Sequence, residues 1–175
     1  AGLNPPTHHL AATGGLLWHP QARMDLVRAG IGLYGLSPDP SVATGAELGL
    51  RPAMRLESPL VQVKRIEAGQ AVSYGGTWSA PTDRWVGLVP LGYSDGIPRA
   101  ASSAGPVGVG SLMTSVVGRV CMDQVVIDLG PAVDETGAPL PAAARVGDTA
   151  VLWGAPAVSD QEAVPTADEW AQACG

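Results

Sequence analysis

Residues 72–77 read Val-Ser-Tyr-Gly-Gly-Thr, and Tyr74 in this segment is the side chain whose setting best suits chemistry. Small residues and two glycines surround it, so the sequence predicts a tyrosine presented on a turn and not packed into a core. A phenol in water has a pKa of about 10, and it becomes a base near neutral pH only beside positive charge. No cation adjoins Tyr74 in the sequence, so that charge would come from a distant segment. Without it, Tyr74 is a strand residue with its hydroxyl at the rim.

Two later segments accompany this turn. Residues 92–99 read Gly-Tyr-Ser-Asp-Gly-Ile-Pro-Arg, and residues 117–124 read Val-Gly-Arg-Val-Cys-Met-Asp-Gln. Taken alone, the first is a turn with an Asp-Gly corner, in which Asp95 holds the loop. Cys121 is predicted to be a small buried packing residue, because no histidine lies nearby in the sequence to activate it. In this order, the three segments resemble the carboxy-terminal domain of alanine racemases, which are pyridoxal-phosphate enzymes that interconvert L- and D-alanine.

The resemblance implies a role for each matched side chain. Tyr74 would be the catalytic base for the L-enantiomer, reaching across a dimer interface, while a lysine on the other face serves the D-enantiomer. Tyr93 would narrow the substrate entrance, and the amide of Met122 would meet the substrate carboxylate. The substrate-binding residues that the resemblance implies are Met122, Tyr93, Arg119, Arg99 and Asp123.

The amino-terminal stretch carries a second match. Residues 9–13 and 27–35 resemble the segments around strands seven and eight of the family's (β/α)₈ barrel, where such barrels often bind phosphate. Arg28 would face the pyridine nitrogen and keep it unprotonated, which weakens electron withdrawal. The family usually has Asn-Ser at residues 12 and 13, and Thr13 keeps only the hydroxyl. The cofactor-binding residues that the resemblance implies are Arg28, Thr13, Gly30 and Ile31; without it, Arg28 is a surface charge at a helix end.

The residues that complete such a site are absent from these 175 residues. The family's cofactor-bearing lysine lies on the first barrel strand, and Lys64, the only lysine here, lies in a predicted scaffold strand. The barrel arginine and the late tyrosine of the family are missing too. The chain also opens at Ala1 without a methionine, which predicts an internal cut point. We therefore expect about half of a homodimeric enzyme with shared active sites, and no activity from this part alone.

Composition and charge argue against several other classes of function. The net charge is −6 and no basic run exists, so nucleic-acid binding is not expected. No apolar run approaches the ~20 residues of a membrane span, and no signal-peptide pattern is present. Two cysteines give no disulfide framework, which favours a reducing compartment and a cytoplasmic location. Three histidines match no standard zinc spacing, so no metal site is predicted.

The predicted fold class is mainly β: an antiparallel, barrel-like carboxy-terminal domain, preceded by the last two βα elements of a (β/α)₈ barrel. The predicted boundaries are 1–38 for the barrel remnant, 39–50 for a linker and 51–175 for the β domain. Alternating apolar residues and glycine turns carry this prediction. The predicted strands are residues 7–11, 29–35, 54–66, 85–91, 115–117, 124–129 and 149–153. The predicted helices are residues 20–26 and a short closing helix after the capping box Thr166–Glu169.

Two alternatives stay open at this point. A broad-specificity or serine-preferring racemase of the same family would share these motifs, because the family's specificity residues lie largely in the missing barrel. A free-standing β-barrel binding or assembly module without chemistry would explain the β domain alone. The match that begins inside the barrel, at residues 9–13, disfavours that module.

Overall fold

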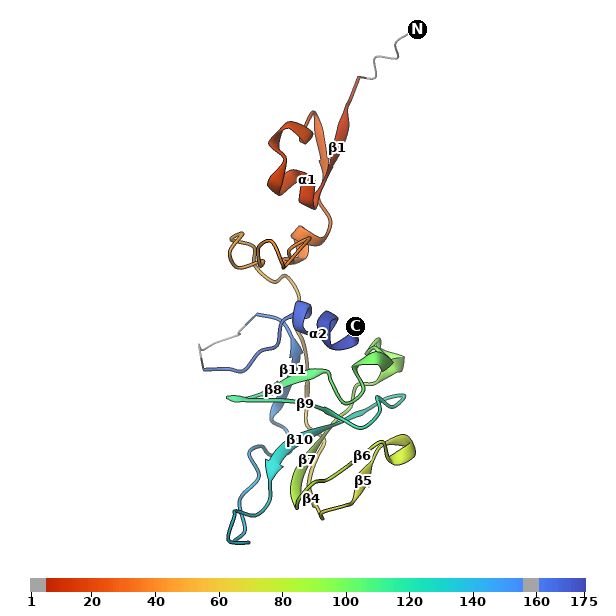
Figure 1. The fold of residues 1–175 in the computed structure, drawn as a ribbon, viewed down its shortest axis with the longest axis vertical. Coiled ribbons are helices and arrows are strands. Elements are labelled where there is room, and N and C mark those ends of the chain that lie inside the picture. Colours follow the sequence, from red (N-terminus) through yellow and green to blue (C-terminus); the bar gives the residue numbers. More distant parts are fainter. Residues whose placement is uncertain (1–5, 156–160) are drawn as a thin grey trace. The chain divides into compact units, whose positions relative to one another are not determined.

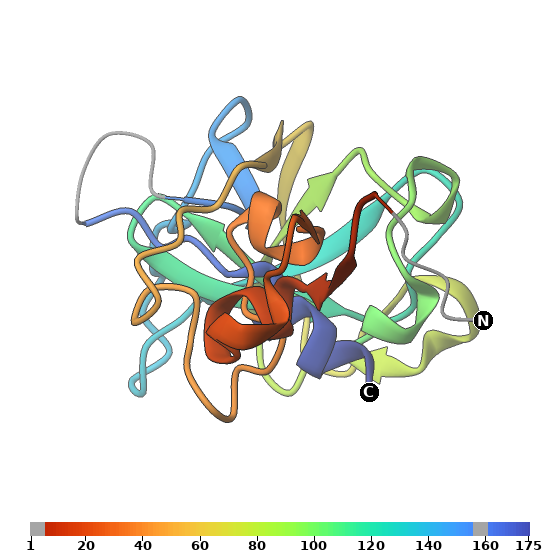
Figure 2. The same ribbon diagram turned by 90° about the horizontal axis from the view of Figure 1, so that it is seen from above.

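The computed structural model describes residues 6–155 and 161–175 and divides into two compact units, Ala1–Met54 and Arg55–Gly175. Figures 1 and 2 show the ribbon from two directions. Each unit has its own sheet and its own hydrogen bonds.

The first unit is built around two parallel strands. The strands are β1 (His9–Ala12) and β2 (Leu26–Arg28), with His9 opposite Leu26 and Ala12 opposite Arg28. The connection between them carries α1 (Thr13–Trp18) and the 3-10 helix η1 (Pro20–Ala22). A second 3-10 helix, η2 (Ile31–Tyr34), follows β2, and residues 39–50 form turns. Parallel strands require such a crossover, which is the βα arrangement that the sequence predicts.

Several predictions in this unit need correction. The strand predicted at residues 7–11 is confirmed as β1, and the helix α1, which was not predicted, begins at Thr13 directly after it. The predicted helix at residues 20–26 is limited to η1. The predicted buried strand at 29–35 is wrong as well: the strand ends at Arg28, is exposed, and gives way to η2. The cause is the Thr13 hydroxyl, which accepts hydrogen bonds from two backbone amides beyond β2 and turns the chain away from an extended path.

The second unit is a seven-stranded antiparallel sheet. Its order is β3-β11-β8-β9-β10-β7-β4 (Figure 1). The strands are β3 (Leu56–Pro59), β4 (Gln62–Ile66), β7 (Arg84–Val89), β8 (Pro106–Val109), β9 (Leu112–Val117), β10 (Val125–Pro131) and β11 (Thr149–Trp153). A separate hairpin pairs β5 (Ala71–Val72) with β6 (Trp78–Ser79). The predicted mainly β class is confirmed.

The two edge strands of this sheet, β3 and β4, are consecutive in the sequence. Only Leu60 and Val61 separate them, so Pro59 and Gln62 lie at most about 11 Å apart. The Leu60 amide donates to Asp148 O beside β11, at 2.9 Å, and the Val61 amide donates to Leu88 O on β7, at 3.0 Å. The chain therefore leaves one edge of the sheet and joins the other within two residues. This forces the sheet to curl into a half-barrel.

The apolar core fills the concave side of the curl. Leu60 is 1% exposed and packs in one cluster with buried valines and isoleucines of four strands, β7, β8, β9 and β10. The helix α2 (Ala167–Cys174) packs on this core through Trp170, whose ring meets Trp153 edge to face at 5.4 Å. The predicted capping box is confirmed, since the Thr166 hydroxyl accepts from Glu169 N at 3.1 Å and the Glu169 carboxylate accepts from Thr166 N.

The predicted strands of the β unit differ from the observed ones in one informative way. The single strand predicted at residues 54–66 is two strands, β3 and β4, because the backbone changes partners at Leu60. The strands predicted at 85–91, 115–117, 124–129 and 149–153 are confirmed within a few residues. The strands β5, β6 and β8 were not predicted, since they are short and β8 begins with proline. In the described ranges, 6–155 and 161–175, no helix has the length and apolarity to cross a membrane.

The junction between β3 and β4 yields a stability prediction. Replacing Leu60 by alanine should lower the free energy of unfolding by about 2–5 kcal/mol, because a core side chain is replaced by a cavity. The matched control is Val61→Ala, one residue further on, where the side chain is 50% exposed and the expected change is within about 0.5 kcal/mol. Urea denaturation followed by tryptophan fluorescence measures both. Equal losses in the two variants would contradict the assigned core.

Candidate active site

Tyr74 lies at the tip of the β5–β6 hairpin. The tip is the short 3-10 turn η3 (Tyr74–Gly76), in which Gly75 and Gly76 both have positive φ, 72° and 55°. Only glycine adopts such angles without strain, so these two residues make the tight turn possible. The side chain of Tyr74 is 61% exposed, as the sequence predicts for a residue presented on a turn.

The connection that leaves β9 lies against this turn. Gly118 has φ 75°, and a Cβ atom at this position would lie 3.0 Å from the Ser73 side chain and 3.1 Å from Val72 O. A glycine is therefore required for the two segments to approach so closely. The next residue, Arg119, is exposed, and its guanidinium lies 3.7 Å from where a Cβ of Gly75 would be. The fold thus brings a guanidinium from a distant segment beside the turn that carries Tyr74.

The same connection also holds the loop of Tyr93. The Tyr93 amide donates to Cys121 O at 2.9 Å, and the Ser94 amide donates to Met122 O at 2.8 Å. The Asp95 carboxylate accepts from Gly92 N at 2.9 Å, which confirms its predicted role in holding the loop. Tyr93 and Met122 are both exposed and lie on neighbouring backbone segments. Figures 1 and 2 show the three loops on the same side of the β unit.

The charged residues complete this edge. The Arg99 guanidinium lies 5.9 Å from the centre of the Tyr93 ring, within the range of a cation–π contact. In the described part of the chain, Arg99 and Arg119 form no salt bridge, whereas Arg55, Arg65 and Arg84 each pair with a carboxylate. Asp123 is exposed beside Met122. Two unpaired guanidinium groups at one edge can attract and bind a carboxylate.

The predicted cofactor residues meet in the first unit. The Thr13 hydroxyl accepts from Gly30 N at 3.0 Å and from Gly32 N at 3.4 Å, which places the start of α1 beside the start of η2. Ile31 is the first residue of η2, and the first amides of a helix have no acceptor within it. A Cβ at Gly30 would meet no atom within 4 Å, so the space beside this backbone is open. The Gly30 amide already donates to Thr13, whereas an amide at the start of a helix, such as that of Ile31, can donate to an anion.

Arg28 has a partner that sequence reasoning missed. Its guanidinium lies 2.5 Å from Nδ1 of His9 and 3.5 Å from Leu10 O. The parallel pairing of β1 with β2 brings His9 and Arg28 together, and only this pairing could have identified the contact. Ser73 and Gly118 were missed likewise, because neither residue type carries a functional signal in the sequence. In residues 6–155 and 161–175, no three His, Cys, Asp or Glu side chains could hold a metal ion.

Comparison with known proteins places the chain in a family. Residues 53–175 match the family "Alanine racemase, C-terminal domain", and residues 1–38 match "Alanine racemase, N-terminal domain". The chain belongs to the alanine racemase family. Alanine racemase from Streptomyces coelicolor is 46% identical over 174 residues, which cover 99% of this chain and 41% of that protein. The biosynthetic alanine racemase of Escherichia coli is 44% identical over 150 residues, 86% of this chain and 39% of that protein.

Solved structures agree with these sequence matches. The crystal structure of alanine racemase from Streptomyces lavendulae superposes with a TM-score of 0.83 at 43% identity, covering 99% of this chain and 42% of that one. The Streptomyces coelicolor structure gives a TM-score of 0.84 at 46% identity, with the same coverage. The chain therefore spans about two fifths of the length of the alanine racemases it matches.

The contact between Gly118 and Ser73 can be tested directly. Gly118→Ala should displace residues 73–76, because the new methyl group would overlap Ser73. We expect large amide chemical-shift changes there in two-dimensional NMR spectra. The matched control is Gly110→Ala, which introduces the same left-handed strain, at φ 56°, but meets no atom within 4 Å. If both variants left the Ser73 and Tyr74 amides unchanged, the turn would not depend on Gly118.

Proposed function

We propose that this chain is part of a pyridoxal-phosphate-dependent alanine racemase that interconverts L- and D-alanine, with Tyr74 as the base for the L-enantiomer. The observation that carries the proposal is that the turn of Tyr74 and the loop of Tyr93 both contact the connection after β9, which itself contains Met122. Nothing in the core of the sheet requires this arrangement of exposed side chains. The named activity of the relatives, alanine racemase, supports the same conclusion.

The residues of the first unit fit the cofactor. Thr13 and the amides of Gly30 and Ile31 would hold its phosphate, since Thr13 lies beside the start of η2 and the space beside Gly30 is open. Arg28 would face the pyridine nitrogen, and its contact with His9 fixes the guanidinium in place. Bound pyridoxal phosphate withdraws electrons from the α-carbon of an amino acid, which makes the α-proton removable.

The second unit would supply the proton chemistry and substrate binding. The Tyr74 phenolate would take the α-proton of L-alanine and become a neutral hydroxyl, and Arg119, beside the turn that carries Tyr74, would belong to the substrate entryway. The Met122 amide binds the substrate carboxylate, while Tyr93, Arg99 and Asp123 line the entrance. The tyrosine would act on substrate bound at the cofactor of the partner subunit, so that the full-length enzyme would be a homodimer with shared active sites.

The proposed role extends to the whole protein. Residues 1–38 would be the end of the (β/α)₈ barrel, 39–50 a linker and 51–175 the carboxy-terminal domain. The match ranges of the two families, 1–38 and 53–175, support this division. We place the full-length enzyme in the cytoplasm, where it would provide D-alanine for peptidoglycan. A solved relative from Bacillus anthracis, 28% identical, was determined with bound L-Ala-P, and one from Clostridium difficile in complex with cycloserine.

Tyr74→Phe in the full-length protein is the decisive substitution. It removes only an exposed hydroxyl, so folding should be preserved. Abstraction of the α-proton from L-alanine should slow by roughly 10²–10⁴-fold, the usual contribution of a general base. The opposing lysine should still exchange the α-proton of D-alanine. Deuterium incorporation from heavy water into each enantiomer, followed by NMR, measures both directions separately.

Tyr34→Phe is the matched control, because Tyr34 is similarly exposed, at 52%, and has no proposed role. It should exchange both enantiomers at the wild-type rate. Near-normal exchange from both enantiomers in Tyr74→Phe would show that Tyr74 is not the base.

The 175 residues alone should not racemise alanine. They contain no lysine that could carry the cofactor in the barrel, since Lys64 lies on β4 of the other unit. Polarimetry with added pyridoxal phosphate should give the rate of the free cofactor. Racemisation above that rate would contradict the expectation that the rest of the barrel is essential.

A further inference from the structure

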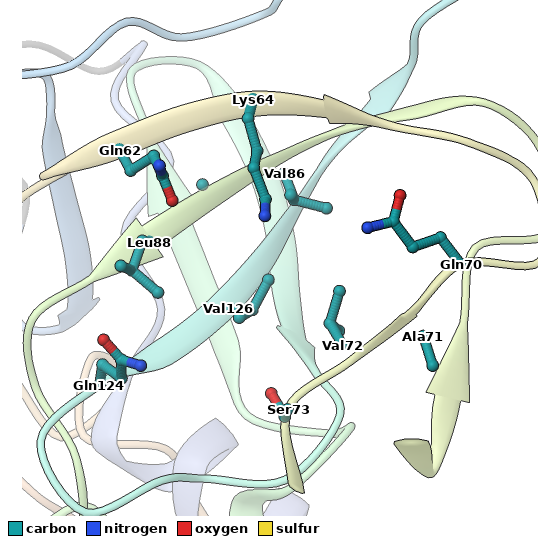
Figure 3. A pocket seen from close by; sticks show the side chains of 11 residues that line it. Gln62, Lys64, Gln70, Ala71, Val72, Ser73, Val86, Leu88, Gln124 and Val126 are labelled. Atoms are coloured by element: carbon teal, nitrogen blue, oxygen red, sulfur yellow. The ribbon is translucent and has the colours of Figure 1, made fainter. Parts of the chain in front are cut away.

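A cavity of about 300 Å³ lies on the convex face of the sheet, under the β5–β6 hairpin (Figure 3). The register of the strands builds its floor. Gln62 and Lys64 on β4 are opposite Leu88 and Val86 on β7, and Leu88 is opposite Val126 on β10. Since side chains alternate between faces, these residues all point away from the core. Residues 70–73 form the wall that faces this floor.

The polar groups of the cavity point toward one another. Figure 3 shows the amino group of Lys64 directed into the space, with the carboxamides of Gln70 and Gln124 and the Ser73 hydroxyl around it. Ser73 Oγ is buried and makes no hydrogen bond, although buried hydroxyls are nearly always paired. Its backbone is also in a region that side chains other than glycine rarely adopt, with φ 60° and ψ −179°. Such strain is typical of functional sites.

The charge in the cavity is unbalanced. Lys64 is the only charged residue that lines it, and within the described residues its ammonium forms no salt bridge. The carboxylate on the same face of β10, Asp128, is held by Arg84 through two hydrogen bonds. A ligand with one negative group would therefore pair with Lys64 and accept hydrogen bonds from the surrounding amides and hydroxyl.

The rest of the lining is apolar. Val86, Leu88 and Val126 on the floor and Val72 on the facing wall are apolar, and the three valines continue into the small hydrophobic cluster of Ile66, Ala80 and Trp78. A fully polar anion such as phosphate would leave this side uncovered, whereas a short alkyl chain would bury it. We propose that the cavity binds a small aliphatic carboxylate, with its carboxylate on Lys64 and its alkyl chain on the valines.

This inference is independent of the proposed racemase activity, because none of these side chains belongs to the candidate active site. Ser73 nevertheless precedes Tyr74 directly and contacts Gly118. A ligand that accepts a hydrogen bond from the Ser73 hydroxyl would therefore contact the residue that begins the turn of Tyr74.

The test is a titration of the 175-residue chain with butyrate, followed by two-dimensional ¹H–¹⁵N NMR. Saturable shifts should centre on the amides of Lys64, Ser73 and Gln124. Butanol, which has the same shape without the charge, and phosphate, which has no alkyl chain, should each bind at least about 10-fold more weakly, as expected for losing a charge-assisted contact. Tighter binding of phosphate or butanol would overturn the carboxylate assignment, and the absence of saturable shifts would overturn the site.

Two neighbouring cations provide matched variants. Lys64→Met should weaken butyrate binding by about 10-fold or more, since it keeps the chain length and removes the charge. Arg65→Gln should leave it within about 2-fold, because Arg65 points to the other face and pairs with Asp83 at 2.6 Å. That hydrogen bond holds the pKa of the Asp83 carboxyl below its ordinary value. Unchanged affinity in Lys64→Met, or an equal loss in both variants, would refute the site.

Two further controls complete the design. Gln124→Leu should also weaken butyrate binding, and it serves as the second variant if Lys64→Met does not fold. Raising the protein concentration without butyrate should leave the Lys64 amide unshifted. A concentration-dependent shift there would show that a carboxylate of a second copy fills the cavity, and it would overturn the small-molecule assignment.

Discussion

The two-residue passage between the edges of the sheet is the constraint on which the β unit depends. Leu60 is bonded to the segment before β11 and Val61 to β7, so neither edge can move away from the other. An open antiparallel sheet of seven strands would expose one apolar face and two unpaired edges. The curl instead encloses the valine and isoleucine side chains of the concave face and brings the strand ends together. The loops of Tyr74, Tyr93 and Met122 connect strands of this unit, so the curl of the sheet determines where these loops lie.

The connection between β9 and β10 is the point at which the loops meet. One end of it, at Gly118, packs against the β5–β6 hairpin. At the other end, the carbonyl oxygens of Cys121 and Met122 accept hydrogen bonds from amides of the Tyr93 loop. Between these contacts, Ser102 and Ser103 bind its backbone through their hydroxyls. Backbone hydrogen bonds and one close glycine contact therefore fix the positions of these loops, although their side chains are exposed. In the proposed enzyme, loops fixed in this way would hold the Tyr74 base in position for a proton bound on another chain.

The hairpin that carries Tyr74 faces two different environments. On one side, its turn touches the Gly118–Arg119 segment, and on the other, Ser73 borders the cavity over β4, β7 and β10. The strained backbone of Ser73 lies between the two. The first environment consists of segments that belong to the motifs of the alanine racemase family. The second follows from the register of three strands and from an unpaired lysine, neither of which a motif describes.

The sequence by itself determined the fold class and indicated which residues to propose for the candidate site. Alternating apolar residues and glycine turns are local signals, so β7, β10 and β11 and the capped helix α2 could be predicted. The three motifs are likewise short continuous segments that can be read from the sequence directly. The tertiary structure decided which segments meet. The division of one predicted strand at Leu60, the loss of the predicted strand at 29–35 and the contact of Arg28 with His9 all depend on hydrogen bonds between residues far apart in the chain. The cavity around Lys64 likewise exists only because pairing of β4, β7 and β10 sets its floor, and long-range pairing leaves no periodic trace in the sequence.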